Sequence, residues 1–575
     1  MKLHALAYLL FASVASTSAQ AQSTFVALKN GDVIPGYGTV NGISFNDLPV
    51  EIADDGTWSY MATLTTPQGN KGVLLRGGVV YSAQGGPTPG IPASTIGGIG
   101  FASIDSRGEI VADLAFSKPN NNGEGIFRGG HVIVQRDQVV VAAGWPANTT
   151  YADLNGVELS RSNQILLAGQ CAPGGNPQVS GFLSVLSLDA QNNLSGESLV
   201  ARTGAQLAGQ PAAIYSLSSW PGQQSINTAG QVIYSAGLLP SGPGADGAVM
   251  LWNNGTSSVL ARDGQPSAVA GMTWLGSSSA QCAIGDNHWA FLGGLNDFRT
   301  VIVRDGAAFK VKGQPFALSG AGGEILGYIT FSNRCMSASG ALAWYAGTIP
   351  SHSGNEGVFV DNQLVFQKDV TPVGGTTANQ MMQSAGSLAI SPNGRFVALK
   401  CSLAPNVTYA IVIVDRFGGA TTECAGDGSG TACPCGNFGA QGHGCANSAN
   451  AAGALLSASG VASVSNDSLV LTSSSMPNTP VIFLQGLAAQ NAGAGVVFGD
   501  GLLCTTSPTI RLGAKVASGG TAQYPGLGNT SISVRGQVPA IGGTRIYQAW
   551  FRDNAAFCTA SHFNVSNAIS VLWMP

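Results

Sequence analysis

The sequence predicts an all-β protein of several domains, and three observations support this fold class. Only 9% of the 575 residues are charged, whereas 44% are hydrophobic and 80 are glycine. This composition favours β-structure with many turns over a charged, disordered chain. A strand–turn–strand pattern also recurs through the first two thirds of the chain, and six of the ten cysteines follow residue 420, where we place a domain boundary.

Residues 1–21 have the features of a secretory signal peptide. Lys2 supplies a positive charge, residues 5–15 (ALAYLLFASVA) form an apolar core, and AQAQ offers a cleavage site after Ala21. A short buried helix is the alternative. No later stretch reaches the roughly 18 apolar residues of a membrane span. We therefore expect a secreted or cell-surface protein with no transmembrane segment after signal removal.

A short motif centred on Gly or Asn recurs seven times between residues 52 and 398. An apolar residue stands four places before each turn residue, and an apolar or aromatic residue stands four places after it. Because Gly and Asn adopt positive φ most readily, each copy predicts a β-hairpin. The seven anchors are Gly56, Gly108, Asn163, Gly230, Asn287, Gly340 and Gly394.

The spacing of these anchors predicts a β-propeller over residues 22–417. Successive anchors are 52, 55, 67, 57, 53 and 54 residues apart, a length that suits the four short strands of a blade. Seven anchors imply seven blades. Coincidental strand–turn–strand patterning in a Gly-rich β-protein is the alternative. Extra residues between Asn163 and Gly230 should form loops on a face of the ring.

The last blade lacks a final strand in the sequence. After Gly394 only RFVALKCSL and YAIVIVDRFG precede the Cys-rich segment. The mature N-terminus carries a spare strand, TFVALKNGDVIPGYG, whose pattern matches the fourth strand and loop in SVLARDGQPSAVAG. We therefore expect residues 25–29 to pair with the strand near residues 411–414, which would close the ring and remove an open edge.

The anchors resemble the N-x-x-G-x-x-A-F tandem repeats of choice-of-anchor proteins, which bacteria export. The resemblance covers most of residues 25–416, although several copies lack the Asn or the Ala-Phe pair. It implies export and surface association and supplies no catalytic residues. The best copy contains Asn227, Gly230, Ile233 and Tyr234, and partial matches contain Gly340, Ala343 and Trp344, and Ala290 and Phe291.

Residues 418–460 form a segment rich in Cys and Gly, which buries too little apolar surface to fold without crosslinks. Cys433, Cys435, His443 and Cys445 suggest a zinc site, but one residue separates the first two cysteines where zinc sites usually have two to four. We therefore favour disulfides and expect no metal. GDGSG offers only Asp427 to a calcium ion, which needs several oxygen ligands.

Residues 461–575 predict a β-sandwich, because short apolar runs alternate with Gly, Pro and Asn turns. The runs are DSLVLTSSSM, PVIFLQGL, TIRLGAKV, SISVRGQV, TRIYQAWFRD and AISVLWMP. The tail, with CPCGN, GCANS, FGDGL and YQAWFRD, looks like a C-terminal module found on diverse exported bacterial proteins. A module shared by different N-terminal parts implies surface retention or sorting.

Eight cysteines are disulfide candidates. Cys282 and Cys335 both stand five places before an anchor in successive repeats, so their strands should converge within bonding distance near the axis. Cys171 and Cys401 belong to non-adjacent blades and should be free thiols. The other expected pairs are Cys424–Cys433, Cys435–Cys445 and Cys504–Cys558.

No catalytic or cofactor motif stands out, so we assign no catalytic, cofactor-binding or metal residues. No basic patch suggests a nucleic-acid partner. The leading hypothesis is an exported non-catalytic binding or surface-structural protein, with an extracellular glycan or envelope component as its partner. A glycan-active enzyme or carbohydrate-binding propeller is the alternative, because catalytic groups can converge from separate blades, and loop Trp and Tyr residues can stack on sugars. The oligomeric state is left open.

Overall fold

The computed structural model describes residues 23–573 apart from 44–48, 120, 161, 175–178, 207–212, 218–222, 240–245, 320–321, 383–385, 417–419, 460–461, 463, 465–466, 468, 527, 541 and 556. In this part of the chain the secondary structure is almost entirely β, as expected from the composition. The exceptions are the short helices η1 (Ser277–Ser279), η2 (Pro434–Gly436), η3 (Gln490–Gly493) and α1 (Ile532–Arg535). The expected signal peptide lies outside the described residues.

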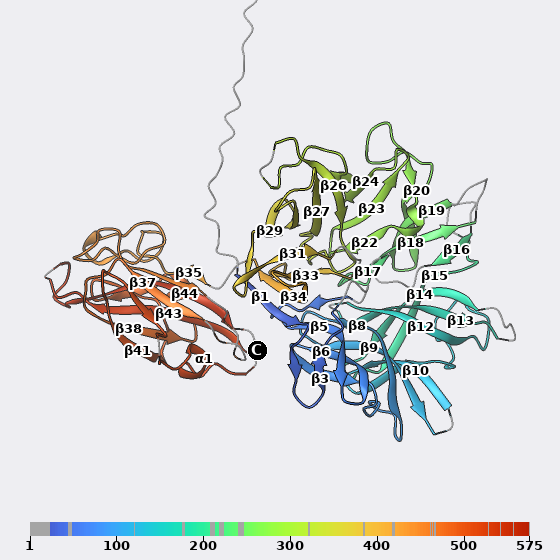
Figure 1. Ribbon diagram of the computed structural model, residues 1–575, viewed down its shortest axis with the longest axis horizontal. Coiled ribbons are helices and arrows are strands. Elements are labelled where there is room, and N and C mark those ends of the chain that lie inside the picture. The colour runs from blue at the N-terminus through green and yellow to red at the C-terminus, as the bar shows by residue number, and fades with distance from the viewer. Residues whose placement is uncertain are drawn as a thin grey trace, which may run out of the picture.

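Seven antiparallel sheets follow one another between residues 23 and 415 of the described chain. Most strands pair with their neighbours in sequence, so each sheet is largely an up-and-down meander. Figure 1 shows the sheets arranged around a common centre in chain order, from blue to yellow. This arrangement is that of a β-propeller. The core lies between successive sheets, and all eight residues of β33 (Phe396–Leu403) are buried.

The first three sheets contain strands of two to ten residues. The first sheet contains β2 (Val33–Ile34), β3 (Gly38–Val40), β4 (Glu51–Ile52), β5 (Trp58–Thr66), β6 (Gly69–Arg76) and β7 (Val79–Ala83). The second contains β8 (Thr95–Ile104), β9 (Ile110–Lys118), β10 (Asn121–Arg128) and β11 (His131–Gln135). The third contains β12 (Thr150–Leu159), β13 (Gln164–Ala172), β14 (Ser180–Leu188) and β15 (Leu194–Arg202).

The next four sheets repeat this plan. The fourth contains β16 (Ile214–Leu217), β17 (Gln224–Ile226), β18 (Val232–Leu238), β19 (Asp246–Asn253) and β20 (Thr256–Arg262). The fifth contains β21 (Trp274–Leu275), β22 (Gln281–Ile284), β23 (Trp289–Leu295), β24 (Thr300–Arg304) and β25 (Ala307–Val311). The sixth contains β26 (Ile325–Thr330), β27 (Ala343–Ile349), β28 (Glu356–Val360) and β29 (Gln363–Gln367). The seventh contains β30 (Pro372–Val373), β31 (Thr376–Met381), β32 (Leu388–Ile390), β33, β34 (Thr408–Asp415) and β1 (Ser23–Lys29).

Strand β1 is the outer strand of this seventh sheet, beside β34. Phe25 lies opposite Ile413, and Leu28 lies opposite Ile411, with a bulge between the two pairs. Leu28 is buried. The two ends of the ring are therefore joined by a hydrogen-bonded ladder, and β34 has a partner on both sides.

The anchor turns adopt the backbone conformation that their residue types favour. Six of the seven anchors, all within the described residues, have φ between 66° and 87°. Asn287 is the exception and does not adopt positive φ. Its turn is one residue shorter: Ile284 pairs with Trp289, whereas in the first sheet Ile52 pairs with Trp58. A shorter turn closes without a left-handed residue at this position.

Neighbouring anchor turns bind one another through their backbones. The amide of Asp286 donates to the Ala338 carbonyl at 2.9 Å, and the amide of Ala338 donates to the Pro392 carbonyl at 2.8 Å. The side chain of Asn393 then donates to the Asp54 carbonyl at 3.0 Å, linking the last anchor turn to the first. These contacts bring residues far apart in sequence together around the axis.

The C-terminal residues form further sheets, drawn in orange and red in Figure 1. One contains β35 (Thr421–Glu423), β38 (Pro480–Gly486), β41 (Ile510–Val516), β43 (Gly543–Arg552) and β44 (Phe563–Trp573); another contains β36 (Leu455–Ser459), β37 (Val470–Ser474) and β42 (Ala522–Tyr524). A hairpin of β39 (Val496–Phe498) and β40 (Gly501–Leu503) completes this part. The two larger sheets contribute to one buried cluster that includes Leu471, Phe483 and Trp573.

Two expectations for this region are wrong. The run SISVRGQV forms helix α1 instead of a strand, because the Gly536 amide bonds to the Ile532 carbonyl at 2.7 Å and Asp467 accepts the Ser533 amide at the start of the helix. The boundary at residue 460 also does not separate two units. Strand β35 pairs with β44, and β36 pairs with β37, so the Cys-rich segment is built into the C-terminal sheets.

Candidate functional site

The axis of the ring holds a cluster of ion pairs that sequence reasoning missed. Arg334, from the segment between β26 and β27, lies between two glutamates. Its Nε is 3.0 Å from Oε1 of Glu51 on β4, and its Nη1 is 3.2 Å from Oε1 of Glu158 on β12. Three sheets that are distant in sequence thus supply one cluster, and both glutamates are buried.

Hydrogen bonds engage every carboxylate oxygen of this axial cluster. Oε2 of Glu51 accepts the Ile104 amide at 2.7 Å. Oε1 of Glu158 accepts the Ser225 hydroxyl at 2.8 Å, and its Oε2 accepts the Asn333 side-chain amide at 2.7 Å. Buried charges are tolerated when they are paired and hydrogen-bonded in this way. All four carboxylate oxygens of Glu51 and Glu158 therefore have a partner.

Burial and charge act in opposite directions on the axial groups. Burial raises the pKa of Glu51 above its usual value, although the Arg334 guanidinium and the Ile104 amide act against this shift. Burial alone would lower the pKa of Arg334, but Glu158 and Glu51 outweigh it and the pKa is raised. Arg334 therefore stays charged at neutral pH.

The repeat frame contained a signal for the axial cluster. The residues five places before the first four anchors are Glu51, Ser103, Glu158 and Ser225. Each of these polar residues directly precedes the apolar residue of its repeat. In the structure the first three of these side chains accept a backbone amide from the next sheet: Ile104 to Glu51, Leu159 to Ser103, and Ile226 to Glu158. The polar residue that recurs beside the apolar position in the first four repeats would have identified them as axial.

Most of the tryptophans belong to the core between sheets. Those at positions 58, 252, 274 and 344 are at most 5% exposed. Trp145 and Trp289 are half-buried, and Trp220 lies outside the described residues. The cavity beside Arg334 at the axis is lined by polar and aliphatic side chains, whereas Phe101 lines the adjoining cavity beside Glu51 and Glu158. No described tryptophan lines either cavity.

Three carboxyl groups gather between the second and third sheets. Asp113 on β9 is 5% exposed, and its Oδ1 has no hydrogen-bond partner in the described residues. Glu124 on β10 is hydrogen-bonded to Asp153 on β12. Burial, followed by the charges of Glu124 and Asp153, holds the pKa of Asp113 well above its usual range. This group therefore favours the protonated form of Asp113.

Replacing Asp113 with Asn should stabilise the protein at neutral pH. Folding raises the pKa of this carboxyl. Below its unfolded pKa, near 3.8, the group contributes its full stability. As the pH rises through the folded pKa, this contribution to the free energy of unfolding is lost. Each pH unit in this window costs about 1.4 kcal/mol. The amide of the Asp113→Asn variant does not ionise, so its advantage should grow from pH 4 upwards in thermal unfolding. Asp189→Asn is the control, because hydrogen bonds from Asn193 lower the pKa of this exposed carboxyl. An unchanged pH profile for Asp113→Asn would contradict the argument.

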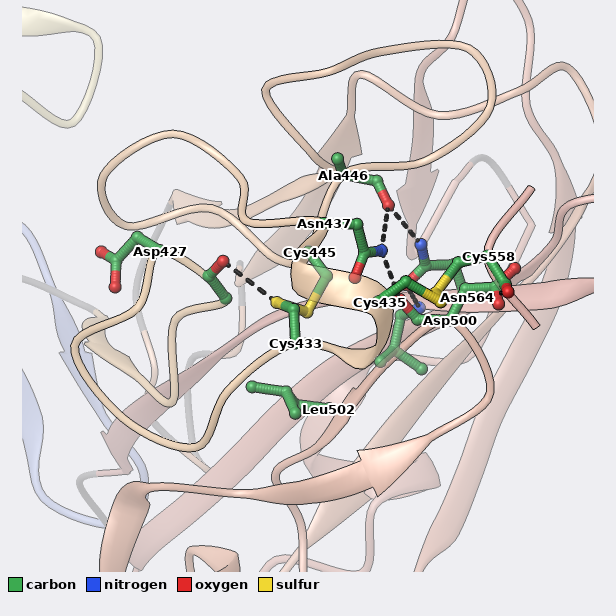
Figure 2. Close-up of a disulfide and its surroundings, with 12 residues drawn as sticks. Asp427, Cys433, Cys435, Asn437, Cys445, Ala446, Asp500, Leu502, Cys558 and Asn564 are labelled. Carbon is green, nitrogen blue, oxygen red and sulfur yellow. Dashed lines mark hydrogen bonds between the residues drawn. A yellow bond between two sulfur atoms is a disulfide. The ribbon is translucent and has the colours of Figure 1, made fainter.

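Three disulfides hold the C-terminal segment to the sheets beneath it. They join Cys424 to Cys504, Cys433 to Cys445, and Cys435 to Cys558, with Cα–Cα distances of 5.8, 5.9 and 5.9 Å. Figure 2 shows Asn437 near the last two bonds, donating to the carbonyls of Ala446 and Asp500 at 3.0 and 2.9 Å. The expectation that crosslinks hold this segment is confirmed. Such bonds suit an oxidising compartment.

The expected disulfide pairings within the C-terminal part are wrong. The sequence predicts Cys424–Cys433, Cys435–Cys445 and Cys504–Cys558, which join cysteines that are close in sequence or share a domain. The segment instead lies across the sheets, so two of the three bonds are long-range, with separations of 80 and 123 residues. Cys433 has extended backbone, whereas Cys435 has φ of 57°, so the two side chains on either side of Pro434 diverge to different partners.

The expected bond between Cys282 and Cys335 is also wrong. Both thiols are free and buried, as are those of Cys171 and Cys401. The short turn at Asn287 is the reason. It shifts the frame by one residue, so Ala283 occupies the place equivalent to Cys335, and Cys282 points to the opposite face of its strand. Burial raises the pKa of Cys335 to about 11 and that of Cys171 to about 12, which makes these thiols unreactive.

Removing the bond between Cys435 and Cys558 should destabilise the C-terminal sheets selectively. A crosslink that closes a loop of 123 residues contributes about 5 kcal/mol by the chain-entropy relation. We expect the double Cys→Ser variant to lower the unfolding temperature of the C-terminal transition in calorimetry and to leave the propeller transition in place. Cys171→Ser is the control, because this cysteine is free. Equal loss of both transitions would show that the two parts unfold together.

Neither a metal-binding cluster nor a membrane-spanning helix is present among the described residues. No group of three or more His, Cys, Asp or Glu side chains there is arranged to hold a metal ion. Asp427 instead closes its own loop, accepting the Ser429 amide at 3.0 Å and the Gly442 amide at 2.8 Å. In the same part of the chain, no helix is both long and apolar enough to span a bilayer.

Several solved structures are similar to this chain at low TM-score. The β-propeller domain of the trilobed protease from Pyrococcus furiosus has 9% identity and a TM-score of 0.31, covering 63% of this chain and 93% of its own. Trypanosoma rangeli sialidase in complex with sialic acid has 10% identity and a TM-score of 0.27, covering 96% and 92%. The polysaccharide lyase Uly1 has 10% identity and a TM-score of 0.32, covering 69% and 99%.

These similarities assign no activity to this chain, because the TM-scores are low. No curated protein matches the sequence. Residues 12–298, just under half of the chain, match a family of unknown function, DUF7453. The matched residues include the first four sheets of the propeller and part of the fifth, which are thus similar to a family whose function is not established.

Proposed function

We propose that this protein is an exported, non-catalytic scaffold. In this proposal the seven sheets are seven blades of a closed propeller that presents binding surfaces, and the C-terminal sheets are a β-sandwich module that retains the protein at the cell surface. The anchor turn in each sheet supports the blade count. The buried cluster shared by the two larger C-terminal sheets supports the sandwich.

The axial cluster is the observation that carries the non-catalytic role. Blades bring side chains together at the axis, so a catalytic site built from several blades is expected there. In this protein Arg334 occupies that place and engages Glu51 and Glu158. Their remaining oxygen contacts come from backbone and side-chain donors. The axial ion-pair cluster therefore has a structural role and holds the blades together.

Retention at the surface is supported by the C-terminal crosslinks and by two resemblances. The three disulfides make the module resistant to unfolding outside the cell. The repeats resemble choice-of-anchor proteins, and the tail resembles a module found on diverse exported proteins. Both resemblances are consistent with a bound partner in the cell envelope, and a glycan is the preferred class of partner.

Two measurements on the purified mature protein test this function. Incubation with isolated cell envelopes should leave the protein in the pelleted fraction, and incubation with a panel of polysaccharides should release no new reducing or unsaturated ends. Serum albumin is the control for non-specific pelleting. Turnover of any polysaccharide would overturn the non-catalytic role, and a protein that stays in the supernatant would overturn envelope binding.

A carbohydrate-binding propeller is the second candidate function. It is favoured by an open cavity on the first sheet whose lining combines a tyrosine with amide and ammonium donors. This cavity lies away from the axial cluster and shares no lining residue with it. Binding there would be compatible with a scaffold that has no catalytic activity.

A further inference from the structure

An open cavity lies on the first sheet, at the end remote from the anchor turn. Its volume is about 650 Å³, within the range of small-ligand sites. Its walls come from the β2–β3 hairpin, the turn between β5 and β6, and the residues that follow β7. The cavity is open on one side, so a ligand larger than a single ring could extend from it.

The local sequence explains why this space stays open. Gly36 and Gly69 have φ of 79° and 109°, conformations that favour glycine. A Cβ atom at either position, or at Gly85, would meet no other atom within 4 Å. Gly38, in contrast, lies so close to β5 that an added Cβ would be 2.5 Å from the Thr65 carbonyl oxygen. The hairpin is thus fixed against the sheet while its tip borders empty space.

Tyr37 and Lys71 give the cavity its chemical character. Tyr37 is 40% exposed, and the ammonium of Lys71 lies 5.8 Å from the centre of its ring. Lys71 is the sole charged residue in the lining, and it forms no ion pair with any described residue. An aromatic face beside an unpaired cation suits a ligand that has both a flat apolar face and a negative charge.

Amide side chains complete the lining. Gln84 is held in place, because its Oε1 accepts the Gly72 amide at 3.2 Å and its Nε2 donates to the Gly97 carbonyl at 2.9 Å. The Oδ1 atom of Asn70 accepts from Asn41 at 3.3 Å, which leaves its NH₂ group as a donor. Gln68, Asn70 and Lys71 together offer N–H donors, so the matching ligand is rich in oxygen acceptors.

We propose that this cavity binds an acidic saccharide, with one sugar ring stacked on Tyr37 and its carboxylate beside Lys71. The C–H face of a pyranose ring is complementary to the electron-rich face of tyrosine, and its hydroxyls pair with the amides of Gln68 and Asn70. An uncharged sugar would give the ammonium no negatively charged partner. The inference rests on the proposed scaffold function and names the ligand class that it presents.

Calorimetric titration with tetragalacturonate, its methyl ester and maltotetraose tests the proposal on the mature protein. Tyr37→Ala and Lys71→Gln should each weaken tetragalacturonate binding by about tenfold, the effect of one stacking or one charged contact. The affinity of the methyl ester for the native protein should equal the affinity of tetragalacturonate for Lys71→Gln. The Lys71→Gln substitution should not weaken binding of the methyl ester further. Both residues are on the surface, so thermal unfolding should be unchanged.

The matched controls are Tyr215→Ala and Lys118→Gln. Tyr215 is 66% exposed on β16, and Lys118 lies 5.3 Å from the ring of Phe116 on the second sheet. Neither lines the cavity, so neither should change binding. Native affinity in Tyr37→Ala and Lys71→Gln would overturn the site while leaving glycan binding elsewhere intact.

Other outcomes also decide the question. Equal affinity for maltotetraose and tetragalacturonate would overturn the acidic specificity. Binding of tetra-aspartate, but not of the saccharides, in a Lys71-dependent way would overturn the saccharide in favour of an acidic peptide. Absence of saccharide binding in a protein that still pellets with envelopes would overturn this inference and leave the proposed scaffold function standing.

Discussion

Replacement of Arg334 with Met is expected to destabilise the propeller by about 3–5 kcal/mol, because it leaves two buried carboxylates without a counter-charge. Glu51 and Glu158 are each 4% exposed and keep their amide donors in the variant. The loss should be largest at neutral pH. The penalty should shrink as the pH falls towards 4.5, the ordinary pKa of a glutamate carboxyl, because burial raises the pKa of Glu51 and its protonation removes the buried charge. Calorimetry between pH 4 and 8 measures both effects.

Two further variants separate charge from lost packing. Arg334→Met combined with Glu51→Gln and Glu158→Gln should recover much of the lost stability, because neutral amides can keep some of the hydrogen bonds without a buried charge. Arg299→Met is the matched control, since Arg299 pairs with Asp297 at the surface and exposed pairs contribute little. If Arg334→Met unfolds like Arg299→Met at pH 7, the axial cluster does not hold the blades together.

Deletion of residues 23–30 is expected to open the ring. Strand β1 covers the outer edge of β34, whose residues 410–414 are fully buried in the intact protein. Without β1 the ladder is lost and the apolar edge faces solvent, which invites pairing with another chain. We expect the propeller to unfold about 5 °C lower in calorimetry and to associate in size-exclusion chromatography with light scattering. The C-terminal transition should be unchanged.

Point substitutions within β1 provide a finer test. Leu28→Asp places a charge at a residue that is 3% exposed, so it should reproduce part of the effect of the deletion. Lys29→Gln changes the neighbouring exposed residue and should behave like the native protein. A deletion variant that remains monomeric with an unchanged unfolding temperature would mean that closure of the ring does not depend on β1.

Local features of the sequence were sufficient to predict the strands and turns of the repeats. Glycine at an anchor such as Gly230 is favoured wherever the backbone must adopt positive φ, so the turns could be recognised one at a time. The alternation of apolar residues indicated the flanking strands. The partner of β1 could be inferred because TFVALKNGDVIPGYG carries the pattern of a fourth strand. The turns and strands depend on neighbours within a few residues, whereas the pairing of β1 was inferred from the strand missing in the last repeat.

Contacts between repeats depended on the tertiary structure. A turn shortened by one residue moved Cys282 to the other face of its strand, and the sequence frame could not register that change. The route of the Cys-rich segment across the sheets decided that Cys435 bonds to Cys558 and not to Cys445. The meeting of Arg334 with Glu51 and Glu158 arises because ring closure brings the inner strands of separate sheets to one axis. The sequence by itself therefore determined the strands and their turns, and the tertiary structure decided which side chains meet, because such pairing depends on distances across the fold.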